Sequence, residues 1–76
     1  MNARQWISTY AERLGSEAPS TDEWRVILEL AGEAAHASER VAAPVACWVA
    51  AKAGVSVEDA LAAARELAAS SADEDG

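Results

Sequence analysis

The fold is decided by residues 20–35, which read STDEWRVILELAGEAA. The stretch opens with a capping-box pattern, in which the side chains of Ser20 and Glu23 each accept a hydrogen bond from the other residue's backbone N–H. Gly32 weakens the predicted helix and is expected at a close approach to a neighbouring helix. We therefore predict a helix over residues 21–38. Its apolar stripe recurs at helical spacing and comprises Trp24, Ile27, Leu28, Ala31, Ala34 and Ala35.

Three further helices are predicted around this segment, over residues 3–14, 44–53 and 57–69. No stretch alternates apolar and polar residues as a half-buried strand does, so the class is all-α. Short linkers favour a compact array of about four short helices in which consecutive helices pack as neighbours. The expected caps and stops are Asn2 with Gln5, Gly15, Gly54 and Ser56.

The helix over residues 44–53 is apolar nearly all round except for Lys52, which predicts a central and largely buried position. Pro44 is expected in its first turn, because proline lacks the N–H that a helix interior needs. The same proline is expected to hold Ala43 out of helical geometry. Trp6, Trp24 and Trp48 each lie on the stripe of a different helix and are expected to meet in the core.

The length of 76 residues suits one domain, which we place at residues 1–70. Residues 71–76 include three consecutive acidic residues, Asp73 to Asp75, and are predicted to form an acidic flexible tail. Over half of the chain is apolar, but alanine predominates, so the core must be thin. A domain of this size typically gains only about 3 to 5 kcal/mol from its core, so a partner surface would be a natural supplement.

The net charge of −7 argues against nucleic acid and an acidic membrane surface as partners, since both require basic residues. We expect no signal peptide and no membrane span, because the longest apolar run is short and contains a proline. The single cysteine, Cys47, cannot form an internal disulfide and is expected to be a buried, inert thiol. Cytoplasmic localisation follows as an expectation.

A distinctive pattern covers residues 28–45, which read LELAGEAAHASERVAAPV. A leucine-rich helix is followed by Ala-x-x-Ala-Ala-His, three residues, an arginine, one residue, Ala-Ala-Pro and an apolar helix. This pattern resembles the signature of the DUF6457 domain, a small actinobacterial family. A tryptophan-containing first helix and an Ala-rich last helix after a glycine extend the resemblance from about Trp6 to Ala69.

Such domains occur alone or fused to a nucleotidyltransferase domain that resembles the molybdenum cofactor guanylyltransferase. The resemblance therefore implies an accessory role near molybdenum cofactor maturation or a molybdenum enzyme, with a maturation enzyme as partner. The family has no established activity. This chain has no Gly-rich phosphate loop, so we do not expect it to transfer guanylyl groups itself.

His36 and Arg40 would share one helical face if the second helix persisted to Arg40. With Pro44 and the backbone N–H groups at Val45 and Ala46, they could hold a phosphate of molybdopterin or a nucleotide, or a partner's carboxylate. The stronger alternative is structural. In it, both side chains cap free carbonyls at the helix C-terminus and pair with acidic neighbours, Glu33 or Glu39.

Three hypotheses on function remain from the sequence. The first is a non-catalytic accessory or interaction domain linked to molybdenum cofactor biosynthesis. A second is a self-associating helical subunit, a homo-oligomer packed through the Ala-rich faces of residues 44–53 and 57–69. A third is a small anion-binding or nucleotide-binding module built on Arg40. An enzyme is the weakest hypothesis, because no residues have the spacing of a catalytic or metal site.

Overall fold

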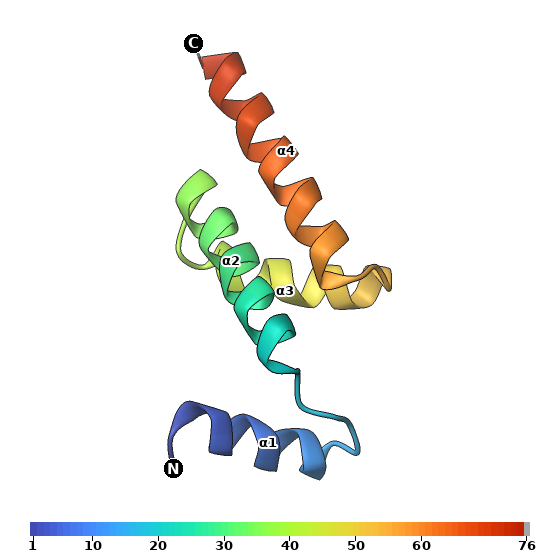
Figure 1. Ribbon diagram of the computed structural model, residues 1–76. Helices are drawn as coiled ribbons and strands as arrows, with labels where there is room; N and C mark the ends of the chain where they lie inside the picture. Colours follow the sequence, from blue (N-terminus) through green and yellow to red (C-terminus); the bar gives the residue numbers. More distant parts are fainter. Residues whose placement is uncertain (76) are drawn as a thin grey trace.

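A computed structural model describes the backbone of residues 1–75 and the side chains of residues 1–70. In this part of the chain it contains four α-helices and no strand (Figure 1). The all-α class with about four helices is thereby confirmed. The helices are α1 (Ala3–Arg13), α2 (Thr21–Ala37), α3 (Ala42–Ala53) and α4 (Val57–Asp75).

The helix starts form as the sequence predicts, through local hydrogen bonds. Asn2 Oδ1 accepts from the N–H of Gln5 at 2.9 Å, and Gln5 Oε1 accepts from the N–H of Asn2 at 3.0 Å. Ser20 and Glu23 form the same reciprocal pair at 3.1 and 2.9 Å. The bonds from the backbone and side chain of Ser20 lower the pKa of Glu23, because they stabilise its ionised carboxylate. Ser56 Oγ completes the set by accepting from the N–H of Asp59 at 3.1 Å.

The junction between α2 and α3 differs from the prediction. α2 ends at Ala37, where Ser38 turns out of helical geometry and its hydroxyl donates to the carbonyl of Ala34 at 2.7 Å. α3 begins at Ala42, so the expectation that Pro44 holds Ala43 out of the helix is wrong. Pro44 is the third helical residue, where the missing N–H needs no partner four residues back.

α4 continues to Asp75 and not to about Ala69 as predicted. Residues 70–75 contain neither proline nor glycine, so nothing in this stretch interrupts the helical hydrogen bonding. The side chains of the expected acidic tail, residues 71–76, lie outside the described side chains, and Gly76 lies outside the described backbone. The predicted flexibility of the tail stays a prediction.

α2 is the central element, because α3 and α4 both pack against it. α3 and α4 meet near the turn that joins them and then diverge (Figure 1). α1 lies across the N-terminal end of α2, and no Cα atom of α1 comes within 8 Å of a Cα atom of another helix. Consecutive helices are therefore packed neighbours from α2 onward, while α1 meets α2 through side chains alone.

The buried core consists of Val26 and Leu30 from α2 and Leu61 from α4. Val26 and Leu30 stand four apart, so the buried face of α2 is rotated away from the stripe predicted at Trp24, Ile27 and Leu28. The rotation arises because α3 and α4 cover one face of α2, while α1 covers the other only loosely. The partly buried residues around the core are Cys47, Ala50, Val57, Ala60 and Ala64.

The expectation of a tryptophan core is wrong. Trp6 is 53% exposed and Trp48 is 63% exposed, while Trp24 is half-buried. The Arg4 guanidinium carbon lies 4.8 Å from the centroid of the Trp24 ring, a cation–π contact that joins α1 to α2. Tryptophan therefore contributes to the surface of this domain and to the contact of α1, not to its centre.

Two glycines are expected to respond in opposite ways to alanine. Gly54 ends α3 at φ +75°, where a Cβ meets no atom within 4 Å but the left-handed backbone is strained, so Gly54→Ala should cost about 1 to 2 kcal/mol. Gly32 is helical with open space around it, not at a close helix approach as predicted, so Gly32→Ala should gain about 1 kcal/mol. Urea unfolding followed by circular dichroism measures both changes. Shifts of the same sign would contradict this account.

Candidate functional site

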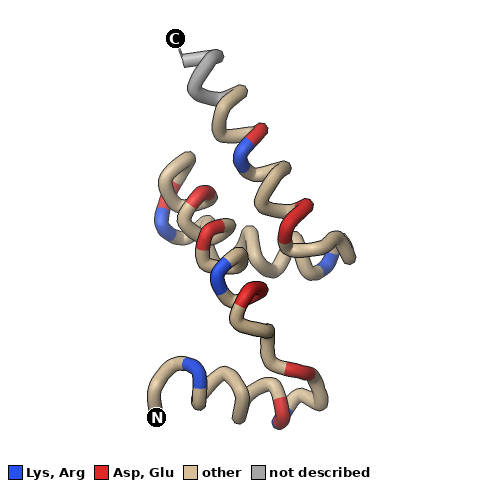
Figure 2. The backbone as a smooth tube through the Cα atoms, in the orientation of Figure 1, with Lys and Arg blue, Asp and Glu red and all other residues tan. Residues whose placement is uncertain are grey.

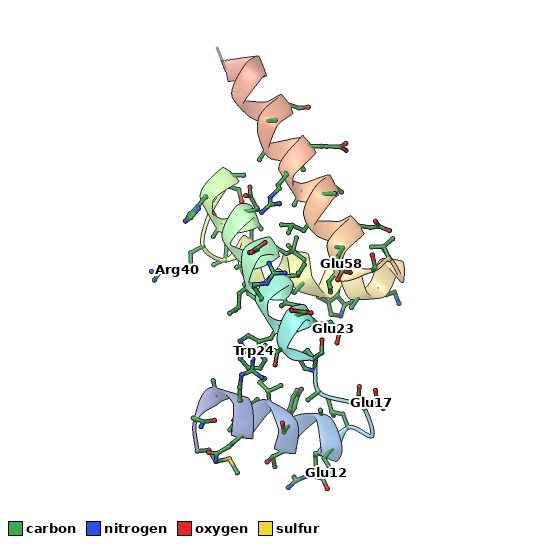
Figure 3. All side chains as sticks on the ribbon, in the orientation of Figure 1. Glu12, Glu17, Glu23, Trp24, Arg40 and Glu58 are labelled. Atoms are coloured by element: carbon green, nitrogen blue, oxygen red, sulfur yellow. The ribbon has the colours of Figure 1, made fainter. Side chains whose placement is uncertain are left out.

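The structure does not bring His36 and Arg40 together on one helical face. Because α2 ends at Ala37, Arg40 falls in the turn between α2 and α3. Both side chains are exposed, and Arg40 points away from the helices in Figure 3. The sequence argument depended on a helix that persists to Arg40, and that condition is not met.

Several of the backbone groups at the N-terminus of α3 cannot serve an anion, because they already donate to carbonyls or have no N–H. Ala42 N donates to the carbonyl of Glu39 at 2.9 Å, and Ala43 N donates to that of Arg40 at 3.1 Å. Pro44 has no N–H, and Ala46 lies far enough inside α3 to donate to the carbonyl of Ala42 four residues back. Anion binding at His36, Arg40 and Pro44 stays a prediction.

Two of the three ion pairs among the described side chains join α2 to α4, the third lies within α2, and none of them involves Arg40. Glu29 accepts from Arg25 at 3.0 Å and from Arg65 at 3.4 Å, and Arg65 also lies 3.6 Å from Glu33. Glu33, one of the two acidic partners expected for His36 and Arg40, is therefore paired with α4. All these side chains are a third or more exposed, so the pairs align two helices and contribute little energy.

An apolar groove lies between α3 and α4, with Leu30 of α2 at its floor. Its volume is about 460 Å³, and its lining contains no charged residue. A second hollow of about 330 Å³ adjoins it between α3, α4 and the end of α2. We call the first feature the α3–α4 groove; its lining is Leu30, Ala42, Val45, Ala46, Val49, Ala50, Ala53, Val55, Ala60, Ala63, Ala64 and Leu67.

The groove corrects the prediction that α3 is central and largely buried. No residue of α3 is buried, and the side chains of Val45 and Val49 are more than half exposed. Figure 2 shows α3 almost free of charge along its length, with Lys52 near its end. The all-round apolar pattern was therefore a sign of an uncovered surface. A helix can be apolar on faces that its own chain does not cover.

The amount of exposed surface is large for the size of the protein. The chain exposes 5839 Å², whereas a monomer of 7.9 kDa typically exposes about 4,400 Å². The excess of about 1,400 Å² exceeds the roughly 800 Å² that each partner buries in a standard protein interface. The shape agrees, since the molecule extends 45 × 24 × 19 Å.

A second apolar surface lies on α1, where Trp6 and Tyr10 stack with ring centroids 5.0 Å apart. Both are about half exposed, and Leu14 continues the row one turn later at 62% exposure. We call Trp6, Tyr10 and Leu14 the aromatic edge of α1. Arg13 lines the same hollow as Trp6 and Tyr10, which gives the edge a positive flank.

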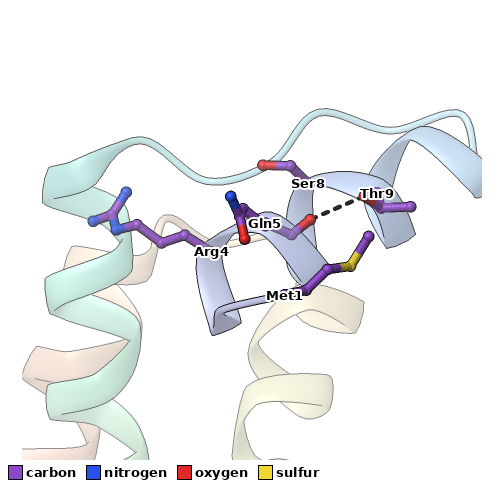
Figure 4. A pocket seen from close by; sticks show the side chains of 5 residues that line it. All are labelled: Met1, Arg4, Gln5, Ser8 and Thr9. Carbon is purple, nitrogen blue, oxygen red and sulfur yellow. Dashed lines mark hydrogen bonds between the residues drawn. The ribbon is translucent and has the colours of Figure 1, made fainter.

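A shallow polar hollow on α1 adjoins the aromatic edge (Figure 4). Its lining side chains are engaged locally: Thr9 Oγ1 donates to the carbonyl of Gln5 at 3.0 Å, and Arg4 extends toward α2. Such a surface has no enclosed polar site in which a substrate could be held.

The reactive groups do not converge on a catalytic arrangement. Cys47 packs half-buried against the core, and burial raises the pKa of its thiol, which disfavours the nucleophilic thiolate. Among the described residues, no three His, Cys, Asp or Glu side chains gather as metal ligands. Within the same residues no helix is both long and apolar enough to cross a membrane.

Comparison with known proteins identifies the family but not the activity. A family model described as a domain of unknown function, DUF6457, matches residues 1–76, the whole chain. No curated protein and no solved structure matches the chain.

Proposed function

Because the chain belongs to the DUF6457 family, whose function is unknown, we propose from its surface that it is a non-catalytic docking domain. The α3–α4 groove is the docking site, and an amphipathic helix of a protein partner is its ligand. The observation that carries the proposal is the uncovered apolar lining of that groove. Helix-in-groove recognition uses such a surface, because apolar side chains at helical spacing fill it.

The chemistry of the groove supports a protein ligand over a small polar molecule. Its walls are alanine, valine and leucine, which offer no hydrogen-bond donor or charge to orient a substrate. Alanine walls let a partner helix approach closely, and the exposed Val45, Val49 and Leu67 provide apolar contact area. The excess surface described above is sufficient for one standard interface.

The resemblance to domains fused with guanylyltransferase-like enzymes suggests the partner. We propose a molybdenum cofactor maturation enzyme, with this domain acting as an accessory that positions the enzyme or its client. The domain needs no molybdopterin or nucleotide of its own for that role. Molybdopterin binding at Arg40 is the competing possibility, and Arg40→Ala tests it separately from any change in the groove.

The test is the affinity of the fluorescently labelled chain for a purified molybdenum cofactor guanylyltransferase from the same host. Val49→Glu places a charge in the groove and should raise the Kd about thirtyfold, the effect of losing one interface hot spot. Ala51→Glu is the matched control, because Ala51 is exposed on α3 outside the groove. Equal binding by folded Val49→Glu would exclude the groove, and no binding by the unmodified chain would exclude this partner.

A further inference from the structure

The same chain carries a ridge that suits its own groove. Trp6, Tyr10 and Leu14 stand at positions i, i+4 and i+8, so they project in a row from one edge of α1. The inner edge of α1, with Ala3 and Ile7, faces Trp24 and Leu28 of α2. The aromatic edge therefore stays available while α1 remains on α2.

The aromatic edge cannot reach the groove within one molecule as folded here. No Cα atom of α1 lies within 8 Å of one in α3 or α4, and α1 lies across the far, N-terminal end of α2 (Figure 1). Two concave grooves also cannot fill each other, whereas a helix with protruding aromatic rings can fill one. A second copy can therefore supply the missing ridge.

The charges on the two surfaces are complementary. α1 carries Arg4 and Arg13 against Glu12 alone, so residues 1–15 hold a net charge of +1. The whole chain has a net charge of −7, so residues 16–76 together hold a net charge of −8. Along the outer edge of α4, the exposed Asp59 and Glu66 stand four before and three after the groove residue Ala63. Arg13 beside the aromatic edge would meet this acidic rim.

We infer that the α3–α4 groove binds the aromatic edge of α1 from a second copy of this chain. The inference rests on the proposed docking function of the groove and names its occupant in the isolated protein. The contact is heterologous, because it joins two different surfaces, α1 of one copy and the groove of the next. A maturation enzyme would then compete with α1 for the same groove.

A complementation experiment tests the heterologous contact. Trp6→Glu damages the aromatic edge and keeps the groove, whereas Val49→Glu damages the groove and keeps the edge. Each variant alone should be monomeric in analytical ultracentrifugation at concentrations where the unmodified chain associates, with Kd raised at least about thirtyfold. An equimolar mixture should form a one-to-one complex, because one sound edge meets one sound groove.

Matched controls keep the result interpretable. Ser8→Glu adds the same charge to α1 on its polar side, and Ala51→Glu adds it to α3 outside the groove. Both should associate as the unmodified chain does, and circular dichroism should show equal helix content in all four variants. In the unmodified chain the Kd of self-association should rise with salt concentration, and in Arg13→Glu it should not. That result would support the pairing of Arg13 with Asp59 and Glu66.

Several outcomes would overturn the inference. A chain that stays monomeric at every concentration has no second copy in its groove, yet its binding to the guanylyltransferase can still support the proposed function. Association that Trp6→Glu leaves intact would mean that α1 is not the occupant. Failure of the two single variants to complement each other would exclude a contact between the edge and the groove.

Discussion

Replacing Leu30 with alanine is expected to remove most of the stability of the domain at 25 °C. Leu30 is 4% exposed and belongs to the core cluster that Val26 and Leu61 complete among the described side chains. A buried Leu→Ala change costs about 2 to 5 kcal/mol, through lost burial and the cavity that remains. The core of a domain of this size supplies a free energy of unfolding of about 3 to 5 kcal/mol in total, so one such change removes most of its stability. Thermal unfolding followed by far-UV circular dichroism measures the effect.

Leu28→Ala is the control for this prediction. Leu28 lies on the same helix, undergoes the same loss of atoms and is 59% exposed. We expect a change of about 0.5 kcal/mol or less, as at most surface positions. If the two variants unfolded at the same temperature, the core would not be where the structure has it. The predicted stripe, which included Leu28 and omitted Val26, would then be the better description.

The positions of the helices were predictable because they depend on neighbouring residues. The capping boxes at Asn2 and Ser20 each join residues three apart, and they form as predicted. The stop at Gly54 is likewise a local backbone property. The ends of α2 and α4 were less predictable, since alanine, serine and acidic residues permit a helix without specifying where it ends.

The buried faces were not predictable, because they depend on where distant elements pack. α2 is apolar on more than one side, and its pattern does not say which side α3 and α4 will cover. The face that became the core contains Val26 and Leu30, and the side with Trp24 meets only the loosely placed α1. The all-round apolar pattern of α3 is compatible both with a buried central helix and with an uncovered surface, so it could not predict an open groove.

In the candidate site, too, the features that depend on packing between distant residues were the ones that the sequence did not predict. The hypothesis for His36 and Arg40 required α2 to continue to Arg40, and the helix ends at Ala37, where Ser38 bonds back to Ala34. Whether residues 38–40 continue α2 decides whether the side chains of His36 and Arg40 share a helical face. The groove is formed by residues of three helices, so no single stretch of sequence predicts it. The one related signal in the sequence was the Ala-rich faces of residues 44–53 and 57–69, which suggested self-association.

The same substitution, Leu→Asn, made separately at two positions of α4 distinguishes a residue needed for folding from one needed for docking. Leu61 and Leu67 both lie on α4, but Leu61 is 6% exposed in the core while Leu67 is 68% exposed in the groove. Leu→Asn lowers helix propensity equally at both positions, by about 0.5 kcal/mol. Leu61→Asn adds a cavity and a buried amide without a partner, so its total cost should be about 4 kcal/mol.

Leu67→Asn should therefore fold nearly as the unmodified chain does and fail instead in association. Its exposed leucine contributes apolar area to the groove, and an amide there would have to lose water against alanine and valine when a helix docks. Calorimetric melting and sedimentation of the two variants give both readouts. Unfolding by Leu67→Asn would make the groove part of the core, whereas full association by a folded Leu67→Asn would exclude this end of the groove from docking.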